Sequence, residues 1–163
     1  MTMVRHRGGG IIVLSVIIAL MLAILPLPLW AEPYRPAWPV LVLIYWCMAL
    51  PQRVGVGIGW TIGLLVDVLK GTLLGQHALA MAVVAYITLN VHQRVRVFPL
   101  WQQALAILML LLLYQLLSLW FDGITGGETA KGWAYWIPSL SGMFLWPWVF
   151  IILRDLRRRF KVS

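Results

Sequence analysis

The chain has 163 residues, of which 62% are hydrophobic and only 11% charged, and its mean hydropathy is +0.89. A soluble domain has roughly 45–50% apolar and about 25% charged residues, and a chain of this length leaves too much surface exposed to hide such an apolar excess. The composition excludes a soluble enzyme and predicts an integral membrane protein. A lone cysteine, Cys47, also excludes a disulfide framework within one chain.

Six apolar segments are candidate transmembrane helices within a single transmembrane domain over residues 1–163. They cover residues 11–30, 40–50, 55–69, 73–89, 104–121 and 136–153. The first segment follows Arg5 and Arg7 as the apolar part of a signal peptide does, but the only plausible cleavage site would put Leu29 where a small residue is needed. A first transmembrane helix is therefore the better interpretation.

The positions of the cations predict the orientation of these six spans. With a cytoplasmic N-terminus, ten of the thirteen Lys and Arg residues fall on the cytoplasmic side, as the positive-inside rule requires. Both termini are then cytoplasmic, and residues 154–163 form a basic cytoplasmic tail. An alternative topology has four spans, with residues 40–69 as a re-entrant hairpin. It also has an even number of spans, so both termini stay on the same side.

The tail is the main charged feature of the sequence. The net charge of +8 would raise nucleic-acid binding in a soluble protein, but basic residues directly after a span are typical of an anchor on anionic lipid. We therefore expect anionic lipid, and not nucleic acid, to contact the tail. Its lipid-surface residues are Arg154, Arg157, Arg158, Arg159 and Lys161.

Small residues recur at a spacing of four in the middle of the chain. The row consists of Gly55, Gly59, Gly63, Asp67, Gly71 and Gly75. Such residues stack on one helix face and allow a second helix to come close. Because each step of four drifts by about 40°, close packing is expected mainly at the first three glycines, either within this chain or against a partner helix.

Asp67 is the one acidic residue inside an otherwise apolar segment. The simplest interpretation is an interfacial pair with Lys70, three residues further on. The alternatives are a buried polar anchor for packing or partner binding, and a proton or ion relay, since a charge inside the membrane needs a partner.

Tryptophans flank several segment ends, as in the aromatic belt of a membrane protein. Trp146 and Pro147 instead lie well inside the last segment. A proline there removes a helical hydrogen bond and predicts a kink, so this pair is a second candidate for helix packing.

Catalytic and cofactor signatures are weak. The histidines lack the spacing of metal ligands, the aspartates other than Asp67 fall at opposite predicted faces, and VGVGIGW lacks the third glycine of a dinucleotide fingerprint. We therefore expect no enzymatic activity, no metal and no cofactor.

Several short stretches, taken in order, resemble one family over residues 5–160. They are Arg35-Pro36 with Trp38, Tyr45-Trp46, residues 49–54, residues 67–71 with Leu74-Gly75, residues 78–81, residues 100–105 and residues 145–148. The chain resembles the rod shape-determining protein MreD family, whose Asp-xxx-Gly-xxx-Gly pattern corresponds to Asp67, Gly71 and Gly75.

This resemblance implies a non-catalytic scaffold of the cell-elongation machinery in the bacterial inner membrane. It implies association with MreC, the actin-like MreB and the peptidoglycan polymerase and transpeptidase. It also implies an all-α fold of six transmembrane helices, similar to the substrate-binding subunits of vitamin uptake transporters. A solute- or lipid-binding membrane subunit of transporter type is the alternative function.

Overall fold

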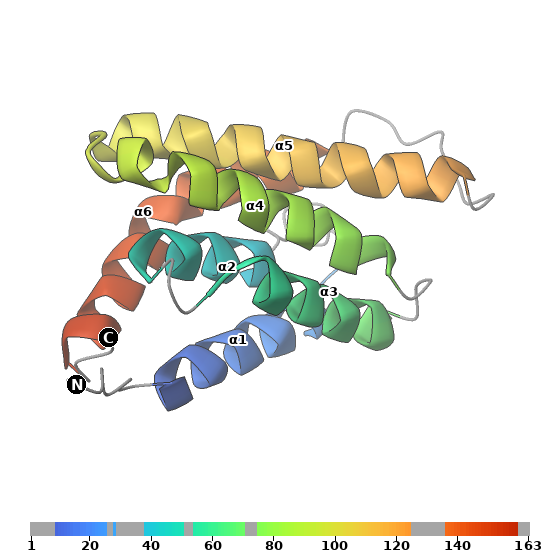
Figure 1. Cartoon of the computed structure of the whole chain (residues 1–163), viewed down its shortest axis with the longest axis horizontal. Helices are drawn as coiled ribbons and strands as arrows, with labels where there is room; N and C mark the ends of the chain where they lie inside the picture. Colours follow the sequence, from blue (N-terminus) through green and yellow to red (C-terminus); the bar gives the residue numbers. More distant parts are fainter. Residues whose placement is uncertain are drawn as a thin grey trace, which may run out of the picture.

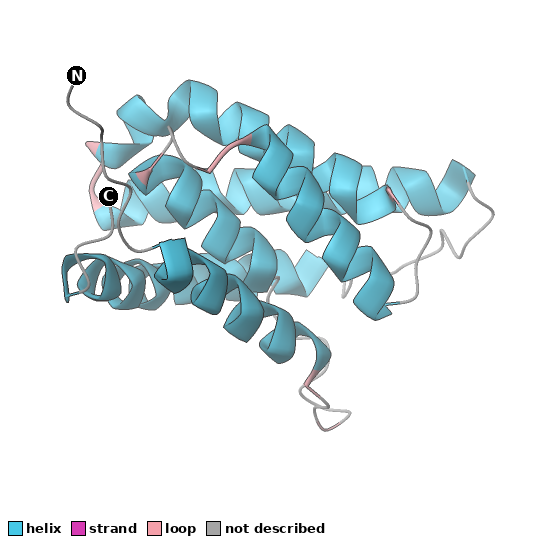
Figure 2. Cartoon of the chain, turned by 60° about the horizontal axis from the view of Figure 1, so that its bottom comes forward, coloured by secondary structure: helices cyan, strands magenta, loops and turns pink. Residues whose placement is uncertain are grey.

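Six α-helices coincide with the six apolar segments in a computed structural model, which describes residues 9–25, 28, 38–50, 54–70, 75–124 and 136–159. The helices are α1 (Gly9–Ile24), α2 (Trp38–Ala49), α3 (Val56–Lys70), α4 (Gln76–Arg96), α5 (Leu100–Ile124) and α6 (Ile137–Arg159). Helices and short connections make up the whole described part of the chain (Figure 2). The predicted all-α class is confirmed.

Successive helices alternate in direction along the long axis of the bundle. In Figure 1, α1, α3 and α5 run from left to right, and α2, α4 and α6 run back. The first turn of α1 and the last turn of α6 therefore lie at the same end (Figure 1). Neighbouring pairs in sequence also pack on each other, most extensively α3 on α4.

The α2 helix is the centre of the bundle. Every side chain from Pro39 to Met48 is buried, and the helix packs against α1, α4 and α6. A helix that is apolar on all sides is stable only when protein or lipid surrounds it completely. Here other helices of the chain surround most of α2. The α3 helix packs mainly against α4. Residues 40–69 thus contain two helices, α2 and α3, with different neighbours.

The helix ends differ from the ends of the predicted segments. The α1 helix stops at Ile24, short of residue 30, because Pro26 disfavours helical geometry at the residue before it. Polar residues do not stop α4, which continues past residue 89 to Arg96. Within it, the Asn90 side chain donates a hydrogen bond to the Tyr86 carbonyl oxygen at 3.0 Å.

The α6 helix includes most of the predicted basic tail. It continues to Arg159 and ends on three arginines, which complement the negative end of the helix dipole. Pro147 lies inside it, and its missing N–H and bulky ring favour a bend. The second half of α6 turns away from the line of the first half (Figure 1).

Glycines allow α3 and α4 to come together closely. A Cβ atom at Gly63 would lie 2.3 Å from the Ala78 Cα atom, and one at Gly59 would lie 3.1 Å from the Ala85 Cβ atom. Gly57 points away from this face, since a Cβ atom there would meet nothing within 4 Å. The two helix backbones are thus in direct contact at Gly63, with no room for any side chain.

We predict opposite effects for alanine at two glycines of α3. Gly57→Ala should raise the free energy of unfolding by up to about 1 kcal/mol, because alanine favours a helix. Gly63→Ala should lower it by about 2 kcal/mol or more, because the methyl group overlaps the backbone of α4. Thermal unfolding of the purified full chain in detergent measures both. Equal stability of the two variants would contradict the close contact.

Candidate functional site

The most strongly constrained polar group in the described chain is the carboxylate of Asp67, near the end of α3. Asp67 is one helical turn beyond Gly63 and its side chain is fully buried, with 0% exposed. Residues four apart share a helix face, so the close approach at Gly63 brings this carboxylate to the first turn of α4. We call this contact between Asp67 and residues 75–78 the Asp67 junction.

The Asp67 carboxylate caps the N-terminus of α4. It accepts hydrogen bonds from the backbone N–H groups of Gly75 at 2.9 Å, His77 at 3.0 Å and Ala78 at 3.4 Å. The first N–H groups of a helix have no partner within the helix, and the N-cap residue Gly75 has no side chain to supply one. A neighbouring helix therefore provides the acceptor, and its negative charge matches the positive end of the α4 dipole.

The His77 side chain completes the Asp67 junction. Its Nδ1 atom lies 2.6 Å from Oδ1 of Asp67, and its ring is 6.0 Å from that of Tyr114 on α5. When Asp67 is ionised it can only accept a hydrogen bond, and the contact then requires the proton on Nδ1. Asp67 thus links α4 to α3 through both backbone and side-chain donors.

Gly75 has a backbone conformation that L side chains rarely adopt, with φ at 101°. Space is not the constraint here, because a Cβ atom would meet nothing within 4 Å. The left-handed conformation directs the Gly75 N–H toward Asp67, which gives a physical reason for glycine at this position.

The Asp67 side chain has no exposed surface and hydrogen bonds to α4, which fits a buried polar anchor, and the interfacial pair with Lys70 stays a prediction. The Lys70 side chain lies outside the described part of the structure, as does Gly71. Gly59, Gly63, Asp67 and Gly75 all lie on the contact between α3 and α4. The sequence pattern did not indicate His77 as a partner of Asp67. The two residues are ten apart in the sequence, and the packing of α3 on α4 brings them together.

Trp146 belongs to a different contact, between α6 and α5. The Trp146 indole is fully buried on α6, and its Nε1 atom donates to Oε1 of Gln103 on α5 at 3.3 Å. Trp46 on α2 donates in the same way to Oγ of Ser15 on α1 at 2.9 Å. These two tryptophans differ from an aromatic belt because their polar atoms connect helices inside the bundle.

Two further buried glutamines link neighbouring helices. Gln76 donates to the backbone carbonyl of Ser118 at 3.4 Å, which joins α4 to α5. Gln115 accepts a hydrogen bond from the Ser139 hydroxyl, which joins α5 to α6. Isolated polar residues within apolar runs are the only sequence signal for such links, and that signal does not identify the partner.

Four of the predicted lipid-surface residues lie in the last turns of α6, at the end of the bundle opposite the Asp67 junction (Figure 1); they are Arg154, Arg157, Arg158 and Arg159. Arg158 and Arg159 are exposed, and Arg154 lies over the Phe150 ring with its Cζ atom 5.7 Å from the centroid. Lys161 lies outside the described residues. Within the described ranges, no three histidine, cysteine or acidic side chains converge as a metal site would require.

Substitutions at Asp67 should separate its capping role from simple loss of charge. Asp67→Ala leaves three N–H groups at the start of α4 without this acceptor, two of them buried, and should lower the free energy of unfolding by about 3 kcal/mol or more. Asp67→Asn keeps one acceptor oxygen and should cost about half as much. Asp155→Asn, at an exposed position on α6, is the matched control and should change little.

Chemical or thermal unfolding of the three variants in the same detergent measures this order. If Asp67→Ala were as stable as Asp155→Asn, the carboxylate would not be the acceptor on which α4 depends.

Comparison with known proteins agrees with the earlier resemblance. A family model described as rod shape-determining protein MreD matches residues 5–156. A rod shape-determining protein MreD from Haemophilus influenzae is 32% identical over 146 residues, which are 90% of this chain and 90% of that protein. No solved structure matches the chain. The family match and the length of the alignment together show that the chain belongs to the MreD family of rod shape-determining proteins.

Proposed function

We propose that this chain, whose family determines rod shape, is a non-catalytic scaffold that crosses the bacterial inner membrane six times. In this proposal it holds partner proteins of the cell-elongation machinery together during peptidoglycan synthesis. The family resemblance suggests MreC, MreB and the polymerase and transpeptidase as those partners.

The surface of the bundle supports placement in a membrane. Residues 100–121 of α5 and 137–159 of α6 are long and apolar enough to cross one, and α1, α2 and α3 contain shorter apolar helices. Trp101 and Trp120 are 63% and 71% exposed at the two ends of α5. Nineteen residues of helix separate them by about 28 Å, close to the roughly 30 Å of a bilayer core with an aromatic belt on each side.

The short central helix is compatible with six spans. The twelve residues of α2 cover only about 18 Å, too little to bridge the hydrocarbon core alone. Its side chains from Pro39 to Met48 are buried by protein, however, so lipid does not determine its length. A mismatch between helix length and bilayer thickness costs free energy only where a helix faces lipid. The α2 helix has little surface that could face lipid.

Charge and helix direction together support cytoplasmic termini. The exposed Arg94 at the end of α4 and the arginines at the end of α6 lie at the same end of the bundle (Figure 1). This end also holds the start of α1. A cation-rich end is expected in the cytoplasm, which puts the Asp67 junction toward the periplasm.

The observation that carries the scaffold proposal is the use of the buried polar side chains. Five buried polar side chains each form a hydrogen bond to a helix other than their own. They are Asp67, Trp46, Trp146, Gln76 and Gln115. A rigid bundle that presents its remaining apolar surface to other helices is suited to a scaffold. A transporter-type solute site would instead need several of these groups to converge on one cavity.

The proposed topology predicts the behaviour of reporter fusions. A reporter that is active only in the periplasm should be silent when fused after Ser163 and active when inserted near Ala130. Western blots should confirm equal membrane levels. An active fusion after Ser163 would contradict the six-span topology.

The scaffold proposal predicts that rod shape and partner retention change together. In cells that lack their own MreD-family protein, Gly57→Ala and Asp155→Asn should restore rods and copurify with MreC. Gly63→Ala and Asp67→Ala should lose both, even when expression is raised to match the membrane level of the controls. Rods restored by a chain that no longer retains MreC would contradict the scaffold proposal.

A further inference from the structure

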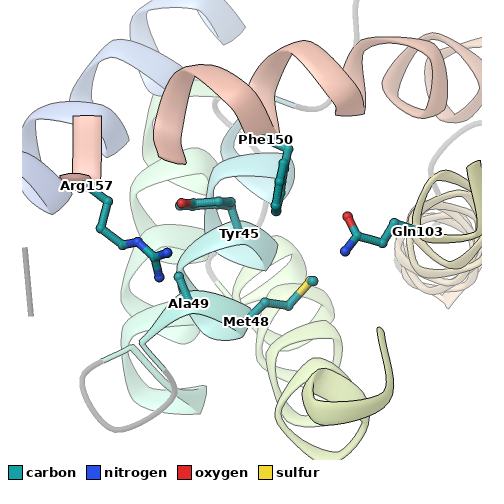
Figure 3. Close-up of a pocket in the computed structure, with 6 residues that line it drawn as sticks. All are labelled: Tyr45, Met48, Ala49, Gln103, Phe150 and Arg157. Atoms are coloured by element: carbon teal, nitrogen blue, oxygen red, sulfur yellow. The ribbon is translucent and has the colours of Figure 1, made fainter. Parts of the chain in front are cut away.

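A pocket of about 180 Å³ lies at the cation-rich end of the bundle, outside the Asp67 junction. It is lined by Tyr45, Met48, Ala49, Gln103, Phe150 and Arg157. Figure 3 shows side chains from α2, α5 and α6 around this space, with the Arg157 guanidinium and the Tyr45 hydroxyl on the same side. Met48 and Phe150 give the pocket an apolar wall.

The Tyr45 hydroxyl is an unused hydrogen-bonding group in this pocket. The residue is only 2% exposed, and its ring packs edge-on against the rings of Trp46 and Phe150. Its hydroxyl has no hydrogen-bond partner in the described part of the chain. The hydroxyl oxygen itself is open to the pocket, where it can donate a hydrogen bond to a ligand.

Arginine side chains give the pocket a strong preference for an anion. Arg157 lines it directly, and within the described residues its guanidinium has no acidic partner. The neighbouring Arg154 lies over the Phe150 ring, and its Nε atom is buried without a hydrogen-bond partner among the described residues. Guanidinium groups bind phosphate and carboxylate oxygens with paired hydrogen bonds.

The size and position of the pocket narrow the choice of anion. It is smaller than the roughly 300–1,000 Å³ of a typical small-molecule site, so it can hold only part of a larger molecule. It lies at the same end of the bundle as the exposed Trp101 on α5, at the level where lipid headgroups are expected. An apolar wall beside a cation matches a phosphate joined to a hydrocarbon chain.

We propose that this pocket binds the phosphate group of one anionic phospholipid, with Arg157 and the Tyr45 hydroxyl as its hydrogen-bond donors. This binding is local and saturable, unlike the diffuse attraction between an anionic membrane and the exposed arginines of α6. It rests on the membrane placement argued under the proposed function, which the reporter fusions test separately.

Titration of the purified full chain in detergent tests the proposal. The probes are dioctanoyl phosphatidylglycerol, dioctanoyl glycerol, which lacks the phosphate, and inorganic phosphate, with isothermal titration calorimetry and native mass spectrometry as readouts. We expect one phosphatidylglycerol per chain and no saturable binding of dioctanoyl glycerol. Inorganic phosphate should bind at least about tenfold more weakly, because it lacks the apolar contact.

Matched variants identify the pocket as the site. Arg157→Gln should weaken phosphatidylglycerol binding about tenfold or more, and Tyr45→Phe should weaken it severalfold. Arg94→Gln removes the same charge from an exposed position at the same end of the bundle, outside the pocket and the lipid-surface residues, and should leave the affinity unchanged. Circular dichroism and thermal unfolding establish that each variant is folded, and Arg157→Lys, which keeps the charge, should retain part of the affinity.

Three results would overturn the proposal. Equal losses in Arg157→Gln and Arg94→Gln would mean that the whole basic surface attracts the lipid. Phosphatidylglycerol and inorganic phosphate binding with equal affinity would mean a site for a free anion. Unchanged lipid binding in Arg157→Gln, together with loss of MreC copurification, would mean that an acidic segment of a partner protein occupies the pocket.

Discussion

The buried carboxylate of Asp67 is the interaction on which the arrangement of α3 and α4 depends. An apolar environment has no water to satisfy the first N–H groups of a helix, and α4 begins after a glycine that cannot cap it. Asp67 supplies the missing acceptor from α3. Gly63 makes this possible, because a side chain there would hold the two backbones apart. A small residue and an acceptor, one helical turn apart, therefore act as one unit.

The same constraint explains how the rest of the bundle is held together. Apolar side chains alone give helices in lipid little reason to associate, because lipid tails are equally apolar. The described structure instead connects α1 to α2 through Ser15 and Trp46, and α5 to α6 through Gln115 and Ser139. Close packing accompanies one of these links, since Gly142 on α6 leaves room for the Leu111 side chain of α5. Polar links determine which helices pair, and small residues determine how closely they pack.

Much of the fold could be predicted from the sequence, because hydropathy and proline positions act locally. Six apolar segments correspond to six helices, and α1 ends close to Pro26. The far ends of α4 and α6 could not be read from hydropathy, since these helices continue into polar and basic residues such as Asn90 and Arg159. At the candidate site, the spacing of Gly59, Gly63 and Asp67 indicated one face. The partner His77 could not be identified, because the pairing depends on a connection whose geometry the sequence does not specify.

Hydrogen exchange at the start of α4 tests the central claim most directly. If Asp67 caps this helix, the amide protons of Gly75, His77 and Ala78 should exchange slowly in the wild-type chain in detergent. In Asp67→Ala their exchange should become much faster, while the amides in the middle of α4, around Val84, should change far less. Rapid exchange of the three amides in the wild-type chain, or equal protection in both chains, would contradict the account.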